Sequence, residues 1–395
     1  MARAEASVQE RLLTPLFLRI IFCTFAYFTA LGIVIPVLPL YVKGPLSGGN
    51  FSVGVTLAMF SLSAVLLRPI AGRIGDQHGR RLIIVGGCAA VAASFAGYVA
   101  ADSLPLLYAA RVVTGLGEAF FFVGAAAAVQ DLAPDHRRGE AMSYFSLGLY
   151  GGLAVGPPLG EALLRDTHFS EVWLAAAAAP AMGAVAALWV PDTRPAVRGG
   201  PGKLINRAGL LPGAVLLASV WGLASFTAFL PLYSREIGLK GSGTIFLAYS
   251  LVVLLLRSAG ARIPDRLGFT KSIVLSMIAS GSGLLTMGLW AAPAGLYLGA
   301  VLFALGQGLA FPALMAMAIA SAPESERGSV VGTVGMFFDV AIGVGALTAG
   351  AIASRLGYSG ALIAAAAGAG AGLALMAGRS MRGPGGEPPV ASRDS

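Results

Sequence analysis

The sequence is poor in charge, cysteine and histidine. Charged residues make up 12% of the 395 residues, whereas a soluble domain has about 25%. This excludes a soluble globular protein, because too few charges remain to cover a water-facing surface. Cys23 and Cys88 both lie inside apolar segments and the three histidines lie between such segments, so we expect neither a disulfide framework nor a metal site. No P-loop and no H-E-x-x-H motif occurs, so we expect no cofactor, no ATP drive and no enzymatic activity.

Apolar segments dominate what is present. Hydrophobic residues make up 56% of the chain and the mean hydropathy is +0.79. A spanning helix needs about 20 apolar residues, so twelve spans would use about 240 residues and leave no room for a separate soluble domain. The fold class expected is an all-α membrane protein with twelve transmembrane helices in two pseudo-symmetric six-helix bundles. The predicted spans are residues 16–41, 51–71, 82–101, 105–130, 140–164, 172–190, 210–234, 242–261, 272–293, 296–321, 329–353 and 359–378.

The distribution of basic residues predicts the organisation and orientation of the chain. We expect a first bundle over 1–190, a cytoplasmic linker over 191–209, a second bundle over 210–378 and a flexible cytoplasmic tail over 379–395. Eighteen basic residues lie on the side of both tails and five on the other side. This bias predicts that the protein lies in a bacterial-type inner membrane with both termini on the cytoplasmic side. The basic residues form no single face, so no nucleic-acid partner is expected.

The two halves repeat each other in sequence. Residues 61–79 and 250–268 match at a shift of 189, which aligns Arg68 with Arg257 and Asp76 with Asp265. The sequence L-P-L-Y also recurs near the start of each half. A parallel repeat of six spans predicts two bundles with a substrate site between them near the midplane, and transport by alternating access.

Three motifs carry a family resemblance. Gly72 to Arg81 reads G-R-I-G-D-Q-H-G-R-R, Arg111 to Ala119 reads R-V-V-T-G-L-G-E-A, and Gly152 to Glu161 reads G-L-A-V-G-P-P-L-G-E. The first two resemble the signature loop and the fourth-span motif of the major facilitator superfamily. The third is similar to the antiporter motif of its twelve-span drug–proton antiporter branch, with Glu161 in place of the final glycine. The resemblance covers essentially the whole chain.

The signature loop is expected to act as a conformational latch. The resemblance implies that Asp76, Arg80 and Asp131 form a charge cluster that closes the cytoplasmic side in the outward-open state. Asp76 could also lie against the N-terminus of the eleventh helix, where a helix dipole favours an anion. The alternative is that the arginines only enforce the topology. The candidate latch residues are Gly72, Arg73, Asp76, Gly79, Arg80, Arg81 and Asp131.

Glu118 is the candidate proton carrier. It lies near the middle of a predicted span, where a charged group costs about 2.5–3.5 kcal/mol and usually has a function. Burial favours the neutral carboxyl group and a nearby Arg111 favours the ionised one, so the balance can change with water access. A permanent Arg111–Glu118 structural pair is the alternative. Asp339 could bind a cationic substrate or a second proton, or be a packing residue, and Gln307 occupies the position of Glu118 in the second half.

Small and aromatic residues complete the candidate site. Glycines at helical spacing allow close helix packing, and a proline bends the fifth span. The helix-packing residues are Gly115, Gly117, Gly152, Gly156, Pro157 and Gly160. Side chains that could line a substrate cavity, or equally serve as packing, are Tyr27, Phe28, Phe122, Tyr144, Tyr150, Phe226, Gln307 and Phe337. Glu161 is expected to be an outer-side gate or a solvated acid.

These observations predict a proton-coupled efflux antiporter, a monomer in the lipid bilayer whose partners are protons and a small-molecule substrate. Arg111 set against Glu118 and Asp339 leaves one negative charge, which favours a neutral or cationic amphiphilic cargo. A lysolipid or lipid flippase of the same fold and a proton-driven sugar or metabolite importer remain alternatives. An integral membrane enzyme or sensor is the least supported reading.

Overall fold

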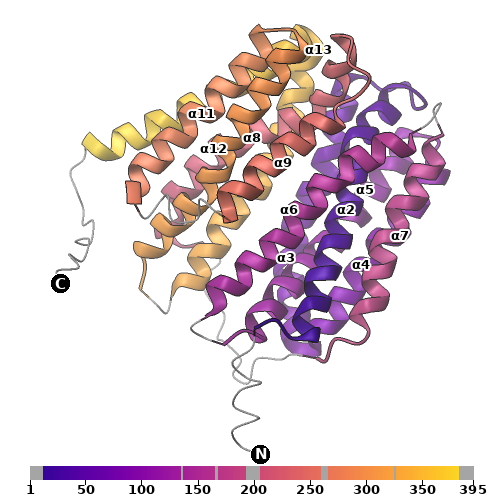
Figure 1. The fold of residues 1–395 in the computed structure, drawn as a ribbon, viewed down its shortest axis with the longest axis vertical. Coiled ribbons are helices and arrows are strands. Elements are labelled where there is room, and N and C mark those ends of the chain that lie inside the picture. Colours follow the sequence, from indigo (N-terminus) through magenta and orange to yellow (C-terminus); the bar gives the residue numbers. More distant parts are fainter. Residues whose placement is uncertain are drawn as a thin grey trace, which may run out of the picture.

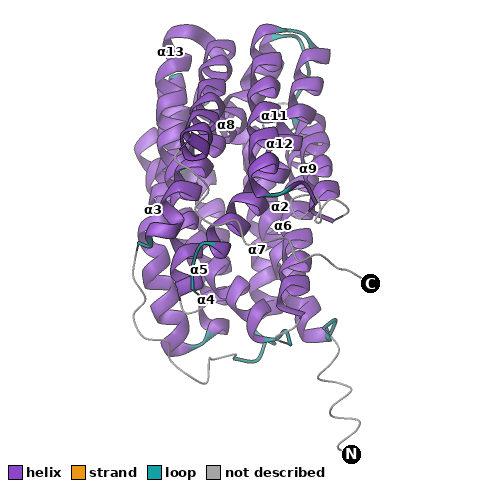
Figure 2. Ribbon diagram, turned by 90° about the vertical axis from the view of Figure 1, so that its left-hand side faces the viewer, coloured by secondary structure: helices purple, strands orange, loops and turns teal. Residues whose placement is uncertain are grey.

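The computed structural model describes residues 12–134, 137–164, 168–192, 205–258, 266–323 and 326–381. Within these ranges the regular structure consists of α-helices and one short 3₁₀-helix, without strands (Figure 2). The first half holds α2 (Pro15–Lys43), α3 (Asn50–His78), α4 (Arg80–Gly97), η1 (Tyr98–Ala100), α5 (Leu104–Asp131), α6 (Arg138–Leu163) and α7 (Phe169–Ala187). The second half holds α8 (Arg207–Glu236), α9 (Gly243–Ser258), α11 (Phe269–Leu289), α12 (Pro293–Ala320) and α13 (Arg327–Met381).

The helices have the length and composition of membrane spans. Among the described residues, 9 helices are long and apolar enough to cross a bilayer, and α9 is a shorter apolar helix. The segment 329–378 within α13 has 50 residues, or about 75 Å, more than twice the hydrocarbon thickness of about 30 Å. Gly357, with φ 73°, breaks the helical conformation inside α13. The prediction of an all-α membrane protein is confirmed, while the count of twelve spans stays a prediction.

Local sequence signals explain where the helices begin and end. The Thr14 side chain accepts a hydrogen bond from the Phe17 amide, and Pro15 occupies the first turn of α2, where its missing N–H costs nothing. Gly79, with φ 98°, ends α3 and precedes α4. A residue with a side chain would be strained in that conformation. The signature loop is therefore a sharp turn between two helices.

The two halves lie side by side (Figure 1). One apolar core is formed by residues of all the helices from α2 to α7. It extends to Phe229 and Ala349 of the second half. Two further cores lie mainly within the second half. The helices that meet across the boundary include α3 with α13 and α6 with α9. The predicted linker falls mostly on residues outside the described ranges, as does the predicted tail beyond Met381.

The predicted packing glycines lie where helices approach closely. A Cβ atom on Gly156 would come within 2.5 Å of the Gly32 Cα atom of α2, and one on Gly152 within 2.6 Å of the Phe25 carbonyl oxygen. Gly160 faces the same helix at Ile33. Gly115 packs against α3 and Gly117 against α4, while Pro157 is buried beside Gly32. Substituting alanine at these contacts would therefore push whole helices apart.

Candidate functional site

Glu118 is buried near the middle of α5. Its side chain is 6% exposed and its Oε2 atom has no hydrogen-bond partner. Its electrostatic neighbours are Arg68, Tyr27 and Asp339. The Tyr27 ring stacks on Phe121 with 4.0 Å between centroids, and its hydroxyl group also lacks a hydrogen-bond partner of regular geometry. The carboxyl group therefore has Tyr27 and Arg68 within interaction range, while its Oε2 atom makes no hydrogen bond of regular geometry.

An ion pair next to Glu118 joins the two halves. Arg68 of α3 places its Nη1 atom 2.6 Å from Oδ2 of Asp339 in α13. The guanidinium group also lies over the Phe122 ring, 5.1 Å from its centroid. Arg68 is not among the site residues predicted from the sequence. Two signals could have found it, because it is a charge inside a predicted span and it aligns with Arg257 in the repeat.

Arg257 occupies the equivalent place in the second half. Its guanidinium group lies 4.4 Å from the centroid of Tyr150, on α6, and 5.5 Å from that of Phe311, on α12. Asp339 aligns with Tyr150, and Phe311 with Phe122, at the same shift of 189 that relates the two arginines. The two sites are thus built alike, except that a phenol ring replaces the carboxylate beside Arg257.

Arg111 does not pair with Glu118. Its Nε atom donates to the Thr56 carbonyl oxygen at 3.1 Å and its Nη1 atom donates to the Tyr98 hydroxyl at 3.4 Å. The guanidinium group also covers the Phe60 ring at 4.6 Å. Two helical turns separate Arg111 from Glu118, about 10 Å along the axis, and α3 offers nearer acceptors. The predicted Arg111–Glu118 interaction is therefore replaced by one between Glu118 and Arg68.

Gln307 takes the place of Glu118 in the second half. Its amide nitrogen donates to the Ser219 hydroxyl at 3.0 Å and to the Ser280 hydroxyl at 3.3 Å, and the side chain is buried. At a shift of 192, the one that relates the two L-P-L-Y sequences, Ser219 also aligns with Tyr27. A neutral amide with its donors satisfied cannot exchange a proton near neutral pH. Only the first half thus has a titratable group at this position.

The signature-loop charges come together within the first half. Arg80 contacts Asp76 at 2.7 Å and Asp131 at 3.3 Å, which joins α3, α4 and α5. Arg73 and Arg81 are exposed and have no ion-pair partner in the described part of the chain. The Asp76 side chain is 53% exposed. No hydrogen bond or ion pair links Asp76 to α13 among the described residues, and the expected contact with the N-terminus of the eleventh helix stays a prediction.

Glu161 forms a second polar link between the halves. Its Oε1 atom accepts from the Ser242 amide at 2.6 Å and from the Ser242 hydroxyl at 3.0 Å, and its Oε2 atom accepts from the Gly243 amide at 2.7 Å. These donors lie at the N-terminus of α9, where a carboxylate is favoured. The acid at the end of the antiporter-like motif is therefore a helix cap supplied from the other half.

The predicted cavity residues separate into two groups. Tyr27, Phe122 and Tyr150 lie at the charged side chains described above. Phe226 belongs instead to an aromatic cluster with Phe246 and Phe303 in the core of the second half. The remaining aromatic candidates pack against other rings or glycine backbone: Phe28 against Tyr27, Tyr144 against Phe17, and Phe337 against Gly213.

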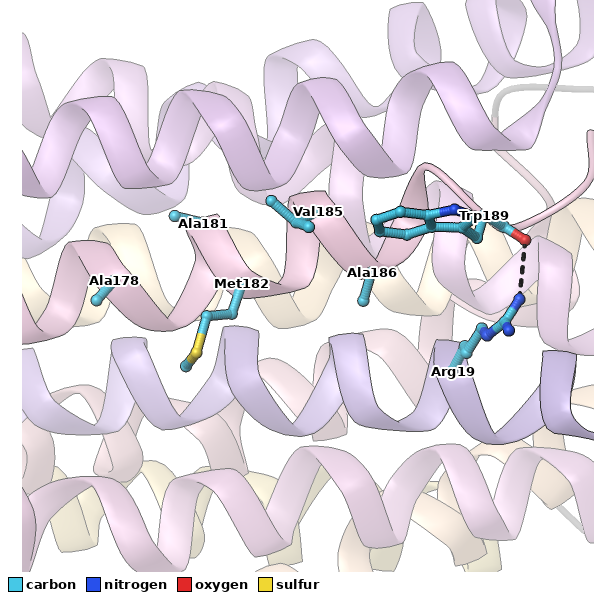
Figure 3. A pocket seen from close by; sticks show the side chains of 7 residues that line it. All are labelled: Arg19, Ala178, Ala181, Met182, Val185, Ala186 and Trp189. Atoms are coloured by element: carbon cyan, nitrogen blue, oxygen red, sulfur yellow. Dashed lines mark hydrogen bonds between the residues drawn. The ribbon is translucent and has the colours of Figure 1, made fainter.

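A shallow groove elsewhere on the surface has a different character. It lies between α2 and α7, has a volume of about 730 Å³, and is lined by Arg19, Trp189 and apolar side chains (Figure 3). Arg19 donates to the Trp189 carbonyl oxygen at 3.2 Å. No acid lines this groove, and both helices belong to the first half. The charged groups between the halves are therefore the stronger candidate for the functional site.

Comparison with known proteins gives consistent matches. The family model described as Major Facilitator Superfamily matches residues 20–268 and 213–394. An uncharacterised MFS-type transporter of Salmonella typhimurium is 29% identical over 362 residues, which cover 88% of this chain and 92% of that relative. A solved POT family transporter in complex with a thioalcohol-conjugated peptide has a TM-score of 0.79 at 14% identity, covering 93% of this chain and 96% of its own. The human organic anion transporter MFSD10 has a TM-score of 0.71 at 18% identity, covering 92% of this chain and all of its own.

Proposed function

Because the chain belongs to the major facilitator superfamily, we propose that it is a proton-coupled secondary transporter that exports a small amphiphilic compound in exchange for protons. The family and its relatives are transporters, which points away from an enzyme. The observation that carries the proposal is the buried Glu118 carboxyl group beside an arginine that also pairs across the two halves.

The contacts of Arg68 suggest how a proton is coupled to movement. Arg68 is shared between Asp339, with which it forms the ion pair, and Glu118, which lies within electrostatic reach. When Glu118 is protonated, Arg68 remains paired with Asp339, so this ion pair continues to join the two halves. An ionised Glu118 attracts Arg68 and weakens the link to α13. Binding and release of one proton thereby changes the contact between the halves, which alternating access requires.

The direction of transport follows from the sequence motifs and the charge bias. The predicted orientation places the Glu161 end outside and the Asp76 end in the cytoplasm. In this arrangement the Glu161 cap on α9 closes the outer side while cargo enters from the cytoplasm. A proton that reaches Glu118 from outside would then be released to the cytoplasm in exchange for the cargo that leaves. The similarity of the Gly152–Glu161 segment to the antiporter motif supports export.

The proposal is tested with purified protein in proteoliposomes that enclose a pH-sensitive dye. A panel of amphiphilic compounds, each in anionic, neutral and cationic form, is added under an imposed pH gradient. We expect at least one compound to move protons through the wild type. Glu118→Gln should abolish this proton movement but keep gradient-free exchange of the same compound, because a glutamine cannot carry the proton.

Glu171→Gln is the matched control. Glu171 is an exposed acid in the first turn of α7, a helix that packs mainly on α2 and α4 of its own half, so its substitution should leave coupling intact. Proton movement that persists in Glu118→Gln would remove Glu118 from the mechanism. A wild type that moves the compounds without protons, or accumulates them inward, would favour the flippase or importer alternatives.

A further inference from the structure

Among the described residues, Arg257 is a cation with no ion-pair partner. The buried or partly buried arginines in the helices of the first half all have oxygen partners: Arg68 has Asp339, Arg80 has two aspartates and Arg111 has two acceptors. The Nε atom of Arg257 is buried and has no hydrogen-bond partner. Its neighbours are aromatic rings, together with the Tyr249 hydroxyl group within electrostatic reach. No carboxylate forms an ion pair with it in the described part of the chain.

The unpaired charge of Arg257 changes the expected charge of the cargo from neutral or cationic to anionic. The expectation of a neutral or cationic cargo counted Arg111 against Glu118 and Asp339. The structure adds Arg68 and Arg257 to this count, so that three arginines (Arg68, Arg111 and Arg257) stand against the two acids Glu118 and Asp339. The acids also lie together beside Arg68. Among the described residues, no acid is therefore paired with the positive charge where Arg257 of α9 meets Tyr150 of α6.

The position of Arg257 suits a ligand that reaches the boundary between the halves. The residue belongs to α9 of the second half, while Tyr150 belongs to α6 of the first half, and these two helices run side by side (Figure 1). The side chain is only half-buried. A planar guanidinium group presents paired donors that match a carboxylate, and the contacts of Arg257 with the Tyr150 and Phe311 rings do not use these donors in a hydrogen bond.

We propose that Arg257 binds a carboxylate group of the transported compound, while Tyr150 and Phe311 contact its apolar part. This inference rests on the proposed function, because it assumes that the cargo is bound between the two halves. It assigns the cargo to amphiphilic carboxylates rather than to amines. Arg68 cannot serve in the same way while Asp339 occupies its guanidinium group.

Ligand-dependent thermal unfolding of the purified protein, without membranes or a pH gradient, tests the proposal. The probes are 2-naphthoate, decanoate and indole-3-acetate, each compared with its neutral amide. A ligand that binds the folded state raises the unfolding temperature by mass action. We expect at least one carboxylate to stabilise the wild type more than its amide does. Arg257→Gln should weaken the binding of that carboxylate at least tenfold and leave the binding of its amide unchanged.

Two further variants separate binding from folding. Arg257→Lys keeps the charge but loses the planar fork, so it should retain part of the preference for the carboxylate. Arg355→Gln removes an exposed arginine of α13 and should behave as the wild type. The unfolding temperature without ligand shows whether each variant is folded.

The outcomes are decisive in both directions. The proposal is overturned if no carboxylate stabilises the wild type more than its amide, or if Arg257→Gln keeps the difference. It is also overturned if Arg257→Lys, folded as the wild type is, shows no preference at all. Failure of proton coupling in the liposome experiment would leave this binding result untouched, since no proton gradient is involved here.

Discussion

Arg68 and Arg257 occupy equivalent positions in the two halves, yet only Arg68 has a carboxylate partner among the described residues. Asp339 lies 2.6 Å from Arg68, whereas Tyr150 covers Arg257 at 4.4 Å. The difference arises because position 339 carries an acid and its repeat equivalent carries a phenol. Two structurally matched sites have thus acquired different charges, one suited to holding the halves together and the other to receiving a ligand.

The Arg68–Asp339 pair should stabilise the folded protein as a unit. Arg68→Gln or Asp339→Asn alone should lower the free energy of unfolding by about 2–3 kcal/mol, because each leaves the partner charge largely buried and unpaired. Denaturant unfolding in detergent measures this change. The double variant should lose less than the sum of the two single losses. Strictly additive losses would show that the two charges do not interact.

Removal of the Glu161 cap should open one end of the molecule. Glu161→Ala deletes the acceptor of three hydrogen bonds from α9, and a hydrogen bond to a charged group contributes about 1.5–3 kcal/mol. Because about 1.4 kcal/mol changes a population ratio tenfold, the conformations open at this end should increase at least tenfold. Spin labels introduced by Lys43→Cys and Lys240→Cys, both exposed, would report the distance distribution.

Two observations make that measurement interpretable. The native cysteines are buried, so they should not take up the label. Glu161→Gln keeps one acceptor oxygen and should produce a smaller shift than Glu161→Ala. An unchanged distance distribution in Glu161→Ala would mean that the cap does not hold this end closed.

Two glycines of α6 should respond to alanine in opposite ways. A Cβ atom on Gly156 would meet the Gly32 Cα atom at 2.5 Å, so Gly156→Ala should cost about 1–3 kcal/mol by overpacking. A Cβ atom on Gly151 would meet the Phe25 ring at 3.5 Å, an ordinary contact. Gly151→Ala should therefore be neutral or gain up to about 1 kcal/mol from helix propensity. Thermal unfolding of both variants checks the contrast, and equal behaviour would contradict the close α2–α6 contact.

Arg111 should prove to be a structural residue. Arg111→Gln loses donors to the Thr56 carbonyl and the Tyr98 hydroxyl, so we expect lower thermal stability and a lower yield of folded protein. The protein that does fold should still couple transport to protons. The ratio of protons to cargo in proteoliposomes is the discriminating measurement. Uncoupled transport by folded Arg111→Gln would restore Arg111 to the proton pathway.

The family and the helical membrane fold could be read from the sequence because their signals are local and repeated. A run of about 20 apolar residues forms a spanning helix whatever its neighbours are, since backbone groups in lipid must bond within the segment. The glycines of α6 could likewise be identified as packing residues from their spacing. The placement of Glu118 near the middle of its helix also follows from counting along the chain.

The partners of the buried charges could not be read in this way. Helical spacing put Arg111 and Glu118 on one face and suggested an interaction, but a long arginine side chain bonds to whichever acceptor is nearest in space. That acceptor belongs to α3, far away in the sequence. In the same way, the sequence alone was compatible with a solvated Glu161. Its donors, the Ser242 and Gly243 amides, lie 81 and 82 residues further along the chain and become its neighbours only in the folded protein.

The sequence by itself determined that this chain is a helical membrane protein of a transporter family with one carboxyl side chain in its fourth predicted span. Only the tertiary structure decided that Arg68 is the cation beside Glu118 and Asp339, and that Arg257 pairs with no acid in the described ranges. The reason is physical. Apolar periodicity acts within a helix, whereas the interaction of two charges depends on their separation in space and on the apolar medium between them.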